Sequence, residues 1–254
     1  MKERDGGGDC REPLLEVCVD DPAGLAAAVE GGADRIELCS ALTVGGLTPS
    51  HGFMAHAARS PIPAHALIRP RTGDFVFTTD DVRVMLDDVR AARSAGLAGV
   101  VIGALRSDGQ LDVAALETLV AAAEGMDLTL DRAFDLAADR EEALETAIRL
   151  GFSRILTSGG AKTAFEGLPR VERLARRAAG RISIMPGAGV RPETAEALLT
   201  LSGVFELHAS CSEPIDGADP RLSAFGFSQP GERRTTVEAV RAMKERMAAA
   251  RRGR

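Results

Sequence analysis

Short runs of apolar residues recur along the chain, and longer segments with a helical spacing of apolar positions follow them. The first run spans residues 14–19 and is interrupted only by Glu16. A run of this kind, bounded by turn residues, is typical of a buried strand. Residues 78–96 illustrate the second kind of segment. Their apolar positions recur every three or four residues, which indicates one buried face of a helix.

This pattern predicts eight strands, each followed by a helix. The strands are expected at 14–19, 35–39, 64–69, 99–103, 127–131, 153–156, 181–185 and 204–208. Regular alternation of strands and helices predicts a parallel sheet. Eight such units in 254 residues favour a single closed (β/α)8 TIM barrel of class α/β. No Gly-x-Gly-x-x-Gly sequence follows the first strand, so an open dinucleotide-binding sheet is disfavoured.

Composition narrows the setting of this barrel. Residues 1–12 are charged and glycine-rich and are predicted to form a disordered lead-in, which leaves 13–254 for the barrel domain. A net charge of −6 and the absence of Trp and Tyr argue against nucleic acid as a partner. No apolar run approaches the ~20 residues of a membrane span. Four cysteines and no secretion signal predict free thiols in the reducing cytoplasm.

Polar side chains gather where the predicted strands end. The carboxyl ends of barrel strands carry the functional groups in enzymes of this fold. In this chain those ends include Glu16 and Cys18, Glu37 and Cys39, Arg69 and Arg71, Asp131 and Arg132, Thr157 and Ser158, Gly187 and Gly189, and His208 and Ser210. The opposite ends of the strands look plainer. The asymmetry predicts a site at the carboxyl end of the barrel.

The first two strands share a Glu-x-Cys spacing, at Glu16 with Cys18 and at Glu37 with Cys39. Side chains alternate along a strand, so each acid and thiol should face the same side at different depths. We expect the two carboxylates at matching positions on neighbouring strands, with Arg69 as the cation that stabilises them. Either an acid/base or ligand-binding triad or a buried structural ion network fits this pattern.

The thiols of Cys18 and Cys39 allow two interpretations. Thiolates are soft ligands that suit Cu(I) or Zn(II). Free cysteines are also among the most frequently buried residues and behave as small apolar side chains. Without a Cys-x-x-Cys sequence, the residues alone favour the second interpretation. Two arrangements remain open: thiols at the rim with the acids below them, or a strand that bends after Glu37.

Two glycine-containing turns and one histidine complete the candidates. Ser158 and Gly159 follow the sixth strand, and Gly187 and Gly189 follow the seventh. Their backbone N–H groups could bind an anion, although a tight turn requires glycine in any case. His208, at the end of the eighth strand, is a candidate general base or metal ligand, and a hydrogen-bonded structural role is equally open.

Several segments, in order, resemble the CutC family of copper homeostasis proteins. They are 15–19, 32–40, 45–50, 68–71, 73–75, 132–135, 156–159 and 185–190. The resemblance implies a TIM barrel, a cytoplasmic location, a homodimer or larger homo-oligomer, and a role in copper handling. Copper binding in the family has been linked to two cysteines that match Cys18 and Cys39. The family usually has a histidine where this chain has Asp131, so a ligand or acid/base role of that imidazole is absent here.

Two functions follow from these observations. The first is a copper homeostasis protein that binds Cu(I) through Cys18 and Cys39. The alternative is an enzyme that acts on a small anionic or phosphorylated metabolite. Its acid/base pair would be Glu16 and Glu37, with Asp131 and His208 as further candidate catalytic residues. Its anion-binding groups would be Arg69 and Arg132, and its phosphate cradle would come from Ser158, Gly159, Gly187 and Gly189. A barrel that serves only in assembly is a third interpretation.

Overall fold

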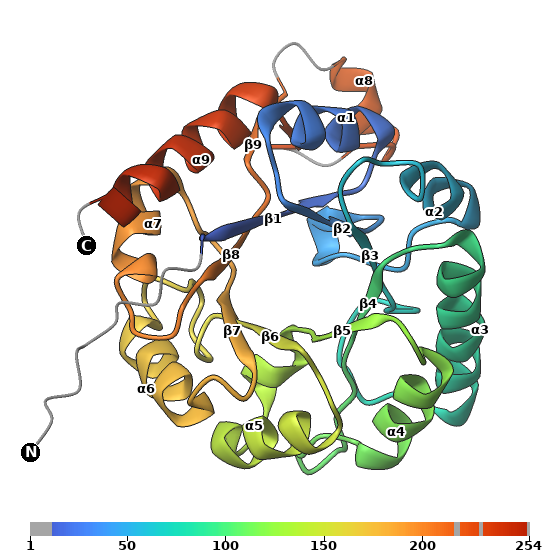
Figure 1. The fold of residues 1–254 in the computed structure, drawn as a ribbon. Helices are drawn as coiled ribbons and strands as arrows, with labels where there is room; N and C mark the ends of the chain where they lie inside the picture. Colours follow the sequence, from blue (N-terminus) through green and yellow to red (C-terminus); the bar gives the residue numbers. More distant parts are fainter. Residues whose placement is uncertain (1–11, 216–218, 229–230, 253–254) are drawn as a thin grey trace, which may run out of the picture.

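The protein forms the predicted barrel. A computed structural model describes residues 12–215, 219–228 and 231–252, so the predicted lead-in at 1–12 lies outside the described residues except for Glu12. Parallel strands alternate with helices around a ring (Figure 1). The eight-stranded sheet has the order β7-β6-β5-β4-β3-β2-β1-β8, and β7 and β8 lie side by side where the ring closes.

The barrel strands lie close to their predicted positions. They are β1 Leu14–Val19, β2 Arg35–Leu38, β3 Ala64–Leu67, β4 Gly99–Ile102, β5 Asp127–Leu130, β6 Arg154–Thr157, β7 Ser183–Pro186 and β8 Glu206–Ala209. All but β1 are four residues long, and β2, β3, β4 and β6 are buried throughout. Because the strands are so short, the register between neighbouring strands decides which side chains lie next to one another.

The helices that surround the strands are α1 Pro22–Gly31, α2 His51–Ala57, α3 Thr79–Ala95, α4 Val113–Ala122, α5 Arg140–Arg149, α6 Leu168–Ala178, α7 Pro192–Leu199 and α9 Val237–Arg252. Local sequence sets several of their ends. Thr78 and Asp81 form a reciprocal capping box at the start of α3, and Gly96 ends that helix with φ at 85°. None of the helices in the described part of the chain has the length and apolar character needed to cross a bilayer.

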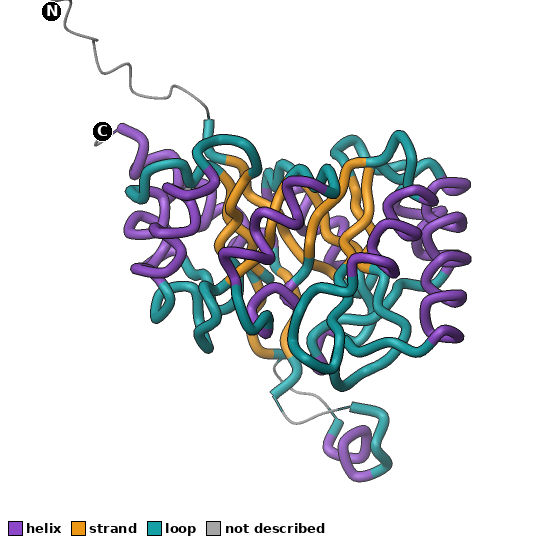
Figure 2. The backbone as a smooth tube through the Cα atoms, turned by 90° about the horizontal axis from the view of Figure 1, so that it is seen from below, coloured by secondary structure: helices purple, strands orange, loops and turns teal. Residues whose placement is uncertain are grey.

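A small addition between β8 and α9 was not predicted. Two short antiparallel strands, β9 (Ser212–Pro214) and β10 (Arg233–Thr235), flank the short helix α8 (Pro220–Ala224). Two short 3₁₀ turns, η1 (Leu42–Val44) and η2 (Arg132–Leu136), follow β2 and β5. Figure 2 shows α8 standing apart from the ring of helices.

The register of the barrel sets which side chains share a level. Glu16 on β1 is paired with Arg35 on β2, and Cys18 is paired with Glu37. On the other side of β1, Glu16 is paired with His208 of β8. The prediction that Glu16 and Glu37 occupy matching positions is therefore wrong. The stagger between parallel barrel strands moves Glu37 two residues further along the barrel axis, to the level of Cys18.

Candidate functional site

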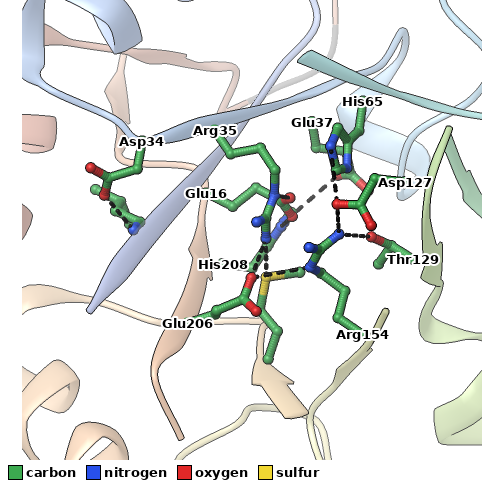
Figure 3. A network of polar contacts seen from close by, with 12 residues as sticks. Glu16, Asp34, Arg35, Glu37, His65, Asp127, Thr129, Arg154, Glu206 and His208 are labelled. Carbon is green, nitrogen blue, oxygen red and sulfur yellow. Dashed lines mark hydrogen bonds and ion pairs between the residues drawn. The ribbon is translucent and has the colours of Figure 1, made fainter. Parts of the chain in front are cut away.

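A buried ion network lies inside the barrel at the amino ends of the strands (Figure 3). The guanidinium of Arg35 lies 2.5 Å from a carboxylate oxygen of Glu16 and 2.5 Å from one of Glu206. Arg154 continues the network, with its Nε 3.1 Å from Glu206 and its Nη1 2.7 Å from Asp127. The expectation that this end of the barrel is plain is therefore wrong.

The network stabilises charged side chains that burial alone would neutralise. Burial opposes ionisation of Glu16, but Arg35 and the hydrogen bond from His208 outweigh it and hold the pKa of this carboxyl far below its usual range. Burial also acts against Glu206, and Arg35 and Arg154 lower the pKa of that carboxyl. Both acids are consequently carboxylates at neutral pH. Arg35, rather than Arg69, is the cation that Glu16 contacts.

His208 links this network to the carboxyl end of the barrel. Its Nδ1 lies 2.9 Å from Oε1 of Glu16, and its Nε2 lies 3.7 Å from Oε2 of Glu37. Burial opposes a charge on the imidazole, but Cys18 and Glu37 raise the pKa of His208 well above its usual value. Because Glu16 holds one ring nitrogen, the other faces Glu37.

Cys18, Glu37 and His208 together form a group with metal-ligand spacing. One potential ligand atom from each residue lies within 4.8 Å of the others, and all three residues are buried. In the described ranges 12–215, 219–228 and 231–252, no other group of three or more His, Cys, Asp or Glu residues meets this spacing. Of the predicted metal ligands, the structure brings Cys18 into this group.

Cys39 lies next to the group. Its Sγ is 3.5 Å from Oε2 of Glu37, and it packs with Cys18, Leu67 and Val101 in a small apolar cluster. The residue is fully buried, and burial, with Glu37 and Cys18, raises the pKa of its thiol well above the usual value. Each interpretation of the thiols thus has support: Cys18 has metal-ligand neighbours, and both cysteines have an apolar environment.

Arg69 has a different role from the one expected. Its Nη1 donates to the carbonyl oxygens of Val44 and Gly46, and its Nη2 donates to that of Gly73. Its guanidinium also lies 4.9 Å from the ring centroid of Phe75. Arg69 therefore fixes the loops after β2 and β3. It forms no ion pair with Glu16 or Glu37, so the predicted Glu/Glu/Arg triad is wrong in its cation.

Asp131 is buried directly after β5, at the position where the family that the sequence resembles usually has a histidine. Its Oδ1 accepts a hydrogen bond from the N–H of Ala133 at 2.8 Å. Burial, with a contribution from Glu37, raises the pKa of Asp131 to about 7. Gly103 makes room for this carboxyl, because a Cβ atom on Gly103 would lie 1.8 Å from Oδ1.

A cavity of about 890 Å³ opens above these groups at the carboxyl ends of the strands. The sequence candidates that line it include Cys18, Glu37, Arg69, Asp131, Arg132 and His208. Gly189 lines it as well, next to the exposed Arg191. Glu16 is fully buried and does not line the cavity. It can therefore act on a bound ligand only through its contact with His208.

The turn after β6 already holds an anion of the protein itself. The carboxylate of Asp135 accepts hydrogen bonds from the backbone N–H groups of Ser158 and Gly160 at 2.9–3.0 Å and from the hydroxyl of Thr157 at 2.6 Å. Arg132 donates to the same carboxylate at 2.9 Å. The predicted phosphate cradle at Ser158 and Gly159 is thus occupied by a side chain.

Sequence reasoning missed Arg35, Arg154, Glu206 and Asp135 as parts of the site. A signal for two of them was present in the sequence. Arg35 and Arg154 each begin a strand, and the alternation that turns Glu37 inward also turns Arg35 inward. For Asp135 no comparable signal exists, because a 3₁₀ turn carries it back to the next strand end.

Comparison with known proteins agrees with the resemblance in the sequence. The CutC family model matches residues 13–213. A family protein CutC from Agrobacterium fabrum is 57% identical over 241 residues, which cover 94% of this chain and 96% of the relative. A family protein CutC from Caulobacter vibrioides is 54% identical over 229 residues, with 89% of this chain and 94% of the relative covered.

A solved structure supports the same assignment. It is that of a putative copper homeostasis protein CutC from Streptococcus agalactiae, with a TM-score of 0.75 and 32% sequence identity. The match covers 78% of this chain and 98% of that one. The fold, the family model and the highly identical relatives agree, and the chain described here belongs to the CutC family.

Proposed function

We propose that this protein binds copper as Cu(I) at the mouth of its barrel and takes part in copper handling in the cytoplasm. Membership of the CutC family supports this proposal, as does the name of the Streptococcus agalactiae protein as a putative copper homeostasis protein. Cys18 supplies the soft sulfur ligand that Cu(I) prefers, and His208 supplies an imidazole.

The observation that carries the proposal is the orientation of His208. Metal-binding histidines commonly donate their second ring N–H to a carboxylate, which fixes the ring and raises its basicity. Glu16 occupies this position at 2.9 Å from Nδ1, so Nε2 points toward Glu37 and the group that contains Cys18. This geometry supports the binding of one ion by both a nitrogen and a sulfur atom.

Cys39 is the second sulfur in this proposal. It shares an apolar cluster with Cys18 and lies 3.5 Å from Glu37, although its thiol is fully buried. Burial opposes loss of the thiol proton, so Cys39 binds only when a cation replaces that proton. Copper affinity is therefore expected to depend strongly on Cys18 and less strongly on Cys39.

An anaerobic competition titration with a chromogenic Cu(I) chelator tests the proposal. The proteins compared are wild type, Cys18→Ser, Cys39→Ser and the double variant, all with Cys10→Ser to remove a thiol outside the described residues. Cys211→Ser is the matched control, because Cys211 is buried and lines the cavity but lies outside the metal group. Equal affinity of the double variant and the wild type would refute the thiol proposal.

A second candidate is an enzyme that acts on a small anionic metabolite. The pKa of about 7 for Asp131, inside a cavity of about 890 Å³, favours it, because a general acid or base works best near the ambient pH. Glu37 and His208 line the same cavity, and Arg132 and the Gly189 turn are its anion-binding groups. Glu16 acts in this scheme only by positioning His208.

A thermal-shift screen tests this candidate. Small carboxylates and phosphate esters are added to the wild type, to Arg132→Ala and to Arg191→Ala. A metabolite of this class that binds in the cavity raises the unfolding temperature of the wild type and has a smaller effect on Arg132→Ala. Metabolites that stabilise all three proteins equally would count against the assigned anion-binding groups.

The same proposal includes a reducing compartment and a homo-oligomer. Cys18, Cys39 and Cys211 are free thiols in the structure, which fits the cytoplasm. A homodimer or larger assembly is proposed from the family resemblance alone. Light scattering coupled to gel filtration measures the mass directly, and a monomer at all concentrations would contradict this part of the proposal.

A further inference from the structure

We infer that the group of Cys18, Glu37 and His208 holds a divalent cation of borderline softness, with Zn²⁺ as the natural choice, and leaves one coordination position open to the cavity. This inference rests on the proposed function in one respect, because both require a metal at this group. It differs from the proposed function in three ways: the ion is divalent, Glu37 is one of its ligands, and one coordination position faces the cavity.

The three donor atoms differ in chemical type. Cys18 offers sulfur, His208 offers nitrogen and Glu37 offers a carboxylate oxygen, all within 4.8 Å of one another. Cu(I) favours soft sulfur and imidazole ligands and gains little from a carboxylate. Zn²⁺ binds all three types, and three protein ligands with a water in the fourth position are characteristic of catalytic zinc sites.

Charge balance also favours a divalent ion. Cys18, Glu37 and His208 are 7%, 5% and 8% exposed, so a net charge at this place is costly. A thiolate and a carboxylate together carry two negative charges, which one divalent cation neutralises. A monovalent cation would leave one negative charge, close to the carboxylate of Glu16 below His208.

The residues below the group hold its imidazole in place. His208 is fixed through Glu16, and Glu16 is fixed through Arg35, whose Nε lies 2.5 Å from Oε2 of the carboxylate. Arg35 is in turn held by Glu206 at 2.5 Å. This chain of buried contacts leaves the imidazole little freedom to rotate, which a preformed metal site requires.

The space above the group accounts for the open position. Cys18, Glu37 and His208 all line the cavity of about 890 Å³, whereas Cys39 does not. Asp131 and Arg132 line the same cavity, so a water or small anion on the metal enters a polar space. A metal at this group therefore has three protein ligands on one side and solvent or substrate on the other.

Co²⁺ is the probe for this inference, because it replaces Zn²⁺ and has a visible spectrum that reports its ligands. We expect the wild-type protein to bind one Co²⁺ per chain, with a thiolate-to-cobalt band of the intensity of a single sulfur ligand. Zn²⁺ should displace the Co²⁺ and remove the band. Addition of azide should change the spectrum of the cobalt protein, because an anion can occupy the open position.

Variants assign the ligands. Cys18→Ser should abolish the sulfur band, and Glu37→Gln and His208→Gln should weaken Co²⁺ binding at least ~10-fold. Cys211→Ser is the matched control and should leave the spectrum unchanged. Circular dichroism verifies that each variant is folded, and Glu37→Asp, which keeps the charge, replaces Glu37→Gln if the latter is not. A wild-type band of two sulfur ligands, halved in Cys39→Ser, would overturn the inference.

Parallel Cu(I) titrations separate this inference from the proposed function. Tight Cu(I) binding without stoichiometric Co²⁺ or Zn²⁺ binding overturns the inference and leaves the proposed function intact. Co²⁺ and Zn²⁺ binding at the group without Cu(I) binding supports the inference and contradicts the copper proposal. If none of the three ions binds, both fail.

Discussion

Glu16 and His208 form a buried pair in which Nδ1 of the imidazole lies 2.9 Å from Oε1 of the carboxylate. The two residues face each other across neighbouring parallel strands, β1 and β8. This contact changes the role of Glu16, because the carboxylate does not reach the cavity and acts through the imidazole. It also fixes the direction of Nε2, on which the proposed metal site depends.

Replacement of Glu16 should weaken metal binding without removing a ligand. Glu16→Gln removes the carboxylate that orients His208, and we expect a loss of ~10–100-fold in metal affinity. Glu206→Gln is the matched control, because Glu206 also pairs with Arg35 but has no contact with His208 among the described residues. Both variants should be less stable than the wild type, but only Glu16→Gln should bind metal more weakly. If Glu16→Gln and Glu206→Gln bind metal with equal affinity, Glu16 does not have this positioning role.

Acid should lower the stability of the protein through ionisable groups at the amino ends of the barrel strands. Burial lowers the pKa of His65 to about 4, from its usual 6.5. A folded-state pKa below the unfolded one means that the contribution to stability is complete above pH 6.5 and is lost as the pH falls toward 4. The loss should reach about 3 kcal/mol for His65 alone. Urea unfolding between pH 7 and pH 4 measures it.

The lowered pKa of Glu206 acts in the same direction, because its contribution is also lost at low pH. His65→Asn should show a smaller decrease in the free energy of unfolding between pH 7 and pH 5 than the wild type shows. A wild-type stability that is constant over this interval would contradict the assignment of His65 as a neutral buried residue.

Asp131 should have the opposite pH dependence. Burial raises its pKa to about 7, so its contribution is present below the unfolded pKa near 3.8 and is lost as the pH rises to 7. Asp131→Asn keeps an oxygen for the N–H of Ala133 and removes the ionisation. We expect the variant to gain stability relative to the wild type as the pH rises from 5 to 8, by about 3 kcal/mol. If the difference in the free energy of unfolding between Asp131→Asn and the wild type does not change with pH, Asp131 ionises at its usual pKa.

Removal of Asp135 should create an anion site where the protein has none at present. Asp135→Ala leaves the N–H groups of Ser158 and Gly160 without their acceptor, and we expect a loss of about 1–3 kcal/mol in stability. Sulfate or phosphate should restore part of this loss in the variant and have little effect on the wild type. Asp139→Ala, which removes the cap of α5, is the control that should not respond to these anions. An equal response of all three proteins would contradict the prediction.

The barrel could be predicted from the sequence because the signals for its strands and helices lie close together in the chain. Glycine at the ends of helices, short apolar strands and caps such as Thr78 each depend on residues close together in the chain. The same reasoning predicted that the carboxyl ends of the strands carry a site, and Cys18, Glu37, Asp131 and His208 do line one cavity.

The relative depth of side chains on neighbouring strands could not be predicted in this way. Alternation gives the side on which Glu16 and Glu37 lie, but the stagger of the barrel sets their level, and it separates them by two residues. The same stagger brings Arg35 beside Glu16, so the nearby Arg69 is left to bind loop carbonyls. The spacing and the family resemblance both pointed to Cys39, whereas the structure brings Glu37 and His208 beside Cys18.

The most direct test of the central claim is X-ray absorption at the copper edge of the wild-type protein loaded with one Cu(I) per chain. The account predicts scattering from sulfur and from one imidazole, at Cys18 and His208. In Cys18→Ser the sulfur contribution should fall and copper should bind more weakly. A wild-type spectrum without imidazole scattering, or one that Cys18→Ser leaves unchanged, would contradict the claim that this group is the metal site.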